Sequence, residues 1–64
     1  MIKIDVLFLI KYKDEKGNSR EERLFKESSA IKRYRELEEQ GIKAERYKLT
    51  TVISHEETKR LDPF

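Results

Sequence analysis

The sequence predicts a small α+β domain: a three-stranded antiparallel sheet with one helix packed on one face. Two observations carry this prediction. Apolar and polar residues alternate over the first dozen positions, which is typical of a β-strand. A stretch in the middle of the chain has apolar residues at helical spacing. With a hairpin turn after the first segment and an extended segment after the second, the element order is β-β-α-β in one domain, residues 1–64.

The first strand is apolar on both of its faces. Every even position from Ile2 to Tyr12 is apolar, and the odd positions are charged at both ends but carry Leu7 and Leu9 in the middle. One helix covers only one face of a sheet, so the other face of this strand needs a different cover. We expect the helix to cover the face that carries Ile4, Val6, Phe8 and Ile10.

A polar loop over residues 14–19 separates the first strand from the next extended run. It contains Gly17 and Asn18, which tolerate positive φ, and this predicts a hairpin. The return strand is expected over residues 20–25. It is short and mostly charged, as natural sheets prefer at an edge.

The helix is expected to begin within residues 27–29, where a serine oxygen can accept hydrogen bonds from the free amides of the first turn. Gly41 stands just past the last turn and suits the left-handed position of a Schellman motif, with Ile42 packing back on Leu37. The apolar stripe of the helix consists of Ala30, Ile31, Tyr34 and Leu37.

Residues 42–54 are extended by composition, but their apolar residues change phase. Ile42 and Ala44 are out of phase with Tyr47 and Leu49, which predicts a bulge or a late strand start near residues 45–46. The spacing of Ser54 and Glu57 fits a capping box and predicts a short helix over residues 55–61. The alternative for residues 55–64 is a loosely held tail.

The last strand can lie beside the second as a parallel crossover or beside the first as an antiparallel neighbour. Because a central strand is buried on both faces, the doubly apolar first strand favours the order 2-1-3. The last strand then adds either Val52 with Thr50 or Leu49 with Ile53 to the open face. The residues expected at an interface are Leu7, Leu9 and Val52.

The composition limits the compartment and the chemistry. The chain has 64 residues, of which 44% are charged and 36% hydrophobic, so a single core is only just sufficient. It has no cysteine, no apolar run near the roughly 20 residues that span a bilayer, and no signal-peptide pattern. We expect a cytoplasmic protein without a membrane partner. Its richness in Lys and Glu is a pattern reported for thermophile proteins.

Catalytic residues are not predicted. His55 is the only histidine, and Ser54 beside it would point the opposite way on a strand. The carboxylates late in the helix look equally solvated, so nothing splits their pKa values into acid and base. Gly17 and Gly41 have turn and cap roles and form no phosphate loop. We therefore expect a non-enzymatic protein with no cofactor and no metal.

The sequence best fits a protein-interaction module that forms a homo-oligomer, most simply a dimer, through the open sheet face or an edge strand. An accessory protein of a phage or mobile element would fit this size and composition. The alternative is a nucleic-acid-binding protein that uses basic residues interleaved with aromatic ones. Its candidate residues are Lys11, Tyr12, Lys13, Arg20, Arg23, Lys43, Arg46, Tyr47 and Lys48.

Residues 60–64 resemble the pentapeptide that binds the bacterial sliding clamp, Gln-Leu-Asp-Leu-Phe in its consensus form. They match it at Leu61, Asp62 and Phe64 and depart from it at Arg60 and Pro63. The resemblance implies a docking peptide. The alternative is that Leu61 and Phe64 fold back onto the sheet.

Overall fold

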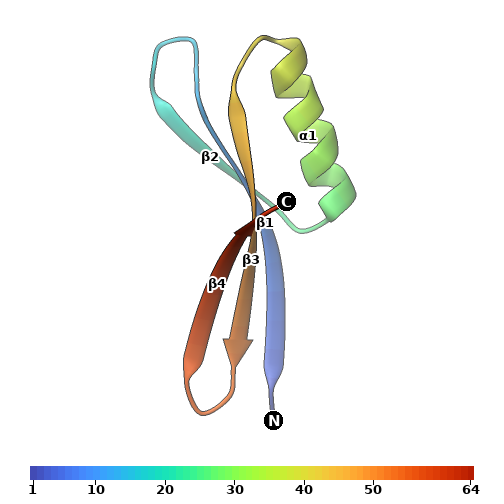
Figure 1. The fold of residues 1–64 in the computed structure, drawn as a ribbon, viewed down its shortest axis with the longest axis vertical. Helices are drawn as coiled ribbons and strands as arrows, with labels where there is room; N and C mark the ends of the chain where they lie inside the picture. Colours follow the sequence, from blue (N-terminus) through green and yellow to red (C-terminus); the bar gives the residue numbers. More distant parts are fainter.

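The computed structural model describes residues 1–64 and contains one helix and one antiparallel sheet of four strands (Figure 1). The order β2-β1-β3-β4 confirms the α+β class and the central place of the first strand. The prediction of three strands is wrong, because the end of the chain forms a fourth. The elements are β1 (Lys3–Lys13), β2 (Ser19–Leu24), α1 (Glu27–Glu39), β3 (Ala44–Ile53) and β4 (Glu57–Pro63).

The β1–β2 hairpin closes around Asp14. Its carboxylate accepts hydrogen bonds from the amides of Lys16 and Asn18, both at 2.9 Å. Gly17 has φ +82°, the conformation for which a glycine was expected in this turn. β2 begins at Ser19, one residue earlier than predicted.

The helix α1 begins at Glu27, within the predicted range, and ends as predicted, but its first turn is not capped as predicted. The amide of Ile42 donates to the carbonyl of Leu37 at 3.0 Å, that of Gly41 donates to Glu38 at 2.9 Å, and Gly41 has φ +77°. These are the two bonds of a Schellman motif. The predicted serine cap is wrong. The N-cap residue is Lys26, which makes no side-chain hydrogen bond. The helix begins at Glu27, so Ser28 and Ser29 already lie inside its first turn and cannot cap it.

The core is small and lies under the helix. Five of the 64 residues are buried, and four of them form one cluster: Phe8, Ile10, Ala30 and Leu37. The expectation that the helix would also cover Ile4 and Val6 is wrong, since Ile4 is 63% exposed and Val6 is exposed too. A helix of 13 residues is about 20 Å long. A strand of 11 residues extends over about 36 Å, so α1 reaches only half of β1.

β3 does not contain the bulge that was one of the two predicted alternatives; it starts late instead, at Ala44, one residue before the predicted position. It pairs with β1 without interruption from Tyr12 opposite Ala44 to Lys3 opposite Ile53. The phase of its apolar residues changes for another reason. Ala44 lies where α1 covers the sheet, and Leu49 lies beyond the helix on the opposite face.

The predicted terminal helix is also wrong, as is the loosely held tail. Residues 57–63 form β4, and the amide of Ser54 donates to the carbonyl of Glu56 at 3.2 Å in the turn before it. The free edge of β3 offers a full ladder of backbone hydrogen bonds, which outweighs one capping box. Phe64 folds back as the alternative predicted, and its ring meets that of Phe8 edge to face at 5.2 Å.

Candidate interaction surface

The helix protects only one half of the sheet. It contacts β1, β2 and β3 but not β4, and in Figure 1 it lies beside one end of the molecule. We call the other end the bare half. It consists of residues 3–7 of β1, residues 49–53 of β3 and residues 57–61 of β4, which are paired with one another. With overall dimensions of 44 × 23 × 14 Å, the molecule is long and thin.

On the helix side of the sheet, the bare half exposes β-branched residues. Ile4 is directly opposite Val52, and Val6 is next on the same face of β1. Val52 therefore shares a face with Ile4. The prediction that it would join Leu7 and Leu9 is wrong, because the register brings Leu49 opposite Leu7 instead. Exposed apolar residues on this side form a candidate contact surface.

On the opposite side, a row of leucines crosses the bare half. Leu7 pairs with Leu49, and Leu49 pairs with Leu61, which is 46% exposed. Leu7 itself is half-buried. A row of directly opposed leucines makes a continuous apolar strip over three strands.

Leu9 differs from Leu7 because it is only 6% exposed. Its direct neighbours on the same face are Arg23 of β2 and Tyr47 of β3, both long side chains. Lys11 lies over the ring of Tyr47, 5.6 Å from its centre. Leu9 is thus covered within one chain, whereas the bare half has no such cover for Leu61.

The bare half also contains a third free edge that the sequence did not reveal. β2 pairs with β1 only from Phe8 onward, so residues 3–7 have β3 on one side and no strand on the other. The two outer strands of the sheet are mostly charged, as is usual for edges. Residues 3–7 are apolar at three of five positions, Ile4, Val6 and Leu7. The return strand expected over residues 20–25 is much shorter than the first strand, and this difference in length is the signal from which the edge could have been found.

The structure divides the predicted nucleic-acid residues between the two faces. Pairing places Tyr12 opposite Arg20, and Phe8 opposite Lys48, on the helix side. The set also includes Lys43, which precedes β3. The members on the opposite face are Lys11, Lys13, Arg23 and Tyr47.

Many of these residues have partners within the chain. Arg20 binds Asp14 at 3.0 Å, and the guanidinium of Arg46 lies 4.4 Å from the centre of the Tyr34 ring. Tyr12 donates to Glu22 at 2.7 Å. Tyr47 donates to Glu45 at 2.6 Å, and this bond raises the pKa of Tyr47. These contacts account for much of the basic and aromatic pattern without a ligand.

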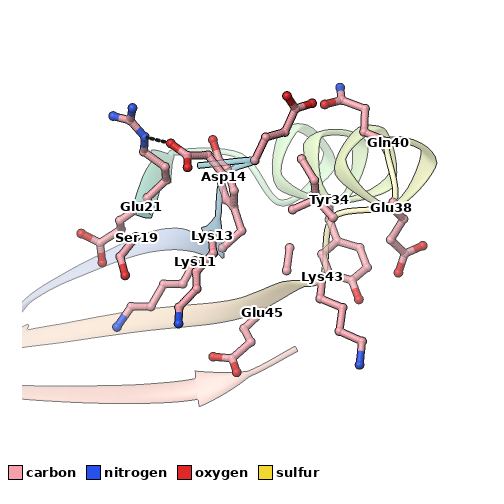
Figure 2. Close-up of a pocket in the computed structure, with 16 residues that line it drawn as sticks. Lys11, Lys13, Asp14, Ser19, Glu21, Tyr34, Glu38, Gln40, Lys43 and Glu45 are labelled. Carbon is pink, nitrogen blue, oxygen red and sulfur yellow. Dashed lines mark hydrogen bonds and ion pairs between the residues drawn. The ribbon is translucent and has the colours of Figure 1, made fainter. Parts of the chain in front are cut away.

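A wide hollow of about 1340 Å³ lies between the hairpin end, the end of α1 and the start of β3 (Figure 2). Charged side chains of both signs line it, so it favours neither an anion nor a cation. The basic residues around it are Lys11, Lys13, Arg20 and Lys43. The acidic ones are Asp14, Glu15, Glu21, Glu38 and Glu45.

The remaining chemical features are few. No three His, Asp or Glu side chains gather into a group that could hold a metal ion. α1 is too short and too polar to cross a membrane. Comparison with protein-family models, with curated proteins and with solved structures finds no match to this chain.

Proposed function

We propose that this protein is a small, non-enzymatic interaction module that associates with its own copy through the bare half of the sheet. The observation that best supports this proposal is that no helix covers either face of the bare half. Ile4 is exposed on one face and Leu61 on the other, at 63% and 46%.

A second copy is the simplest cover for such a surface. With only five buried residues, the chain is at the lower limit of what one core can stabilise. A symmetric contact buries the same patch on both chains, so each apolar residue contributes twice. Association therefore provides the burial that the helix does not.

Sedimentation equilibrium tests this proposal. At micromolar concentrations we expect a mass above the 7.7 kDa of one chain. Ile4→Glu places a charge in the centre of the exposed patch and is expected to shift the protein to monomer. A monomeric wild-type protein at all these concentrations would overturn the proposal.

Ser28→Glu is the matched control. It adds the same charge at an exposed position in the first turn of α1, away from the bare half. A negative charge there suits the helix dipole, so folding is not harmed. We expect its mass to equal that of the wild type. An equal loss of mass in both variants would mean that net charge, and not the bare half, controls association.

Nucleic-acid binding is the second candidate, supported by Lys11, Lys13 and Arg23 on one face with Tyr47. It is less favoured because Glu21 and Glu45 lie among them and Arg23 is 3.9 Å from Glu21. Single-stranded DNA or RNA would then cause spectral shifts that weaken steeply with salt. No shift at low ionic strength would exclude this candidate.

A further inference from the structure

We infer that two copies join edge to edge, through an antiparallel pair of their β1 strands centred on Ile4. The result is a continuous six-stranded sheet across the two bare halves. This inference rests on the proposed self-association and specifies its geometry. The free edge at residues 3–7 is the segment that pairs.

The backbone of this edge is ready to pair. In the hairpin, the amide of Asp14 donates to Asn18, so even-numbered residues of β1 direct their backbone groups toward the β2 side. Backbone direction alternates along a strand, and β1 is regular from Lys3 to Lys13. The amides and carbonyls of Ile4 and Val6 therefore point toward the side that no strand occupies. A second copy would satisfy them.

Backbone direction limits the register. Two antiparallel strands pair through residues that point toward each other, so even residues must face even residues of the second copy. The symmetric registers that remain are centred on a single residue. Those centred on Lys3 or Asp5 put like charges directly opposite each other, which is unfavourable. A register centred on Val6 would place Ile4 opposite Phe8 of the second copy, and Phe8 is already paired with β2.

The register centred on Ile4 places opposite charges across from each other. Lys3 lies opposite Asp5 of the second copy, and Asp5 lies opposite its Lys3. Both side chains are exposed on the same face, and within one chain Nζ of Lys3 lies 3.8 Å from Oδ2 of Asp5. On the other face Ile4 meets Ile4, and Val6 meets Ile2 of the second copy. All of these apolar side chains are exposed in the single chain.

The two outer edges are poorer choices. β2 carries four successive charged residues, and its Glu22 is already bound to Arg33 at 2.9 Å. β4 ends in Pro63, which has no amide hydrogen to donate. Residues 3–7 combine a free backbone edge with two exposed apolar side chains on one face, Ile4 and Val6, whereas β4 exposes only Leu61.

Charge reversal tests the register. In Lys3→Glu the new carboxylate faces Asp5 of the second copy, and in Asp5→Lys two ammonium groups meet. Each single variant is expected to weaken association by about tenfold, and the double variant to restore it. Lys59→Glu is the matched control, because Lys59 is exposed on β4 outside this edge. It is expected to associate like the wild type.

Disulfide formation gives a second, independent measure. The chain has no cysteine, so Ile4→Cys introduces a single thiol. Directly opposed residues of this kind have Cα atoms about 5.5 Å apart, within the range of a disulfide. Mild oxidation is expected to yield a covalent dimer from Ile4→Cys. Val52→Cys, on the same face but one strand further in, is expected to yield none.

Two results would overturn this inference, and they differ. If the wild type associates but Ile4→Cys does not crosslink and the charge variants associate normally, the copies meet through a sheet face and the proposed function stands. If the wild type is monomeric, both the edge pairing and the proposed function are wrong.

Discussion

Glu22 is the side chain that ties β1, β2 and α1 together. Its carboxylate accepts two hydrogen bonds from Nε of Arg33, at 2.9 and 3.1 Å, and one from the hydroxyl of Tyr12 at 2.7 Å. Arg33 also reaches Glu36 at 3.3 Å. These bonds favour the ionised carboxylate, so Arg33 and then Tyr12 hold the pKa of Glu22 below its ordinary value of 4.5, against a partial desolvation that raises it.

A lowered pKa predicts the pH dependence of stability. The contribution of Glu22 is complete above pH 4.5 and disappears as the pH falls through the lowered pKa. Glu22→Gln is expected to cost about 1 kcal/mol of unfolding free energy at pH 7 and less at pH 3. Urea titrations at both pH values measure this. Asp14, whose pKa is also lowered by its turn hydrogen bonds, is present in both proteins and cancels. A constant difference would contradict the prediction.

Gly41 is the second residue with a specific role. At φ +77° a Cβ meets no atom within 4 Å, so the penalty of a side chain is purely conformational. Gly41→Ala is expected to lower the free energy of unfolding by about 1 kcal/mol. Gln40→Ala is the control, with φ −83°, and is expected to change little. Equal unfolding midpoints for both variants would contradict this account.

At the scale of elements, the C-terminal segment shows where local signals are outweighed. Ser54 and Glu57 have the spacing of a capping box, but Thr58 to Asp62 pair with β3. One cap is worth about 1 kcal/mol. A full ladder on the free edge of β3 satisfies many backbone groups at once. A sequence pattern shows a local preference such as a helix cap, but it does not show that the outer edge of β3 is free to pair with another strand.

The aromatic end of the chain fixes β4 to the covered part of the fold. Phe64 packs edge to face on Phe8, and the guanidinium of Arg46 lies 5.1 Å from its ring centre. Phe64→Ala is expected to cost about 2 kcal/mol of stability, measured by thermal or urea unfolding. Phe25→Ala is the control, because Phe25 is 83% exposed. Equal losses from both would show that Phe64 has no anchoring role.

The elements with strong local signals were predictable from the sequence. The alternation of β1, the Gly17 turn and the Gly41 cap each depend on a few neighbouring residues. How far α1 reaches along β1 depends on the length of the helix relative to the length of the strand and on where the helix packs. The uncovered Ile4 therefore appeared only in the structure, and so did the position of Val52 on its face.

At the scale of the whole molecule, the two ends of the sheet are stabilised by different contacts. The end under α1 contains the buried cluster around Ile10 and Leu37. The bare half has strand pairing and the half-covered row of Leu7 and Leu49. A sheet without a second layer is marginal by itself. Stability of the bare half is therefore expected to depend on association.

This dependence predicts that the melting temperature Tm rises with protein concentration. If only the folded chain associates, each tenfold increase in concentration stabilises a dimer by about 1.4 kcal/mol. Thermal unfolding followed by circular dichroism over a hundredfold range of concentration measures the effect. Ile4→Glu removes the exposed apolar side chain at the centre of the free edge, so its Tm is expected to be lower and independent of concentration. Ser28→Glu should retain the wild-type dependence, because it leaves the bare half intact. A wild-type Tm that does not change with concentration would mean that the strand pairing of the single chain is sufficient to hold the bare half together.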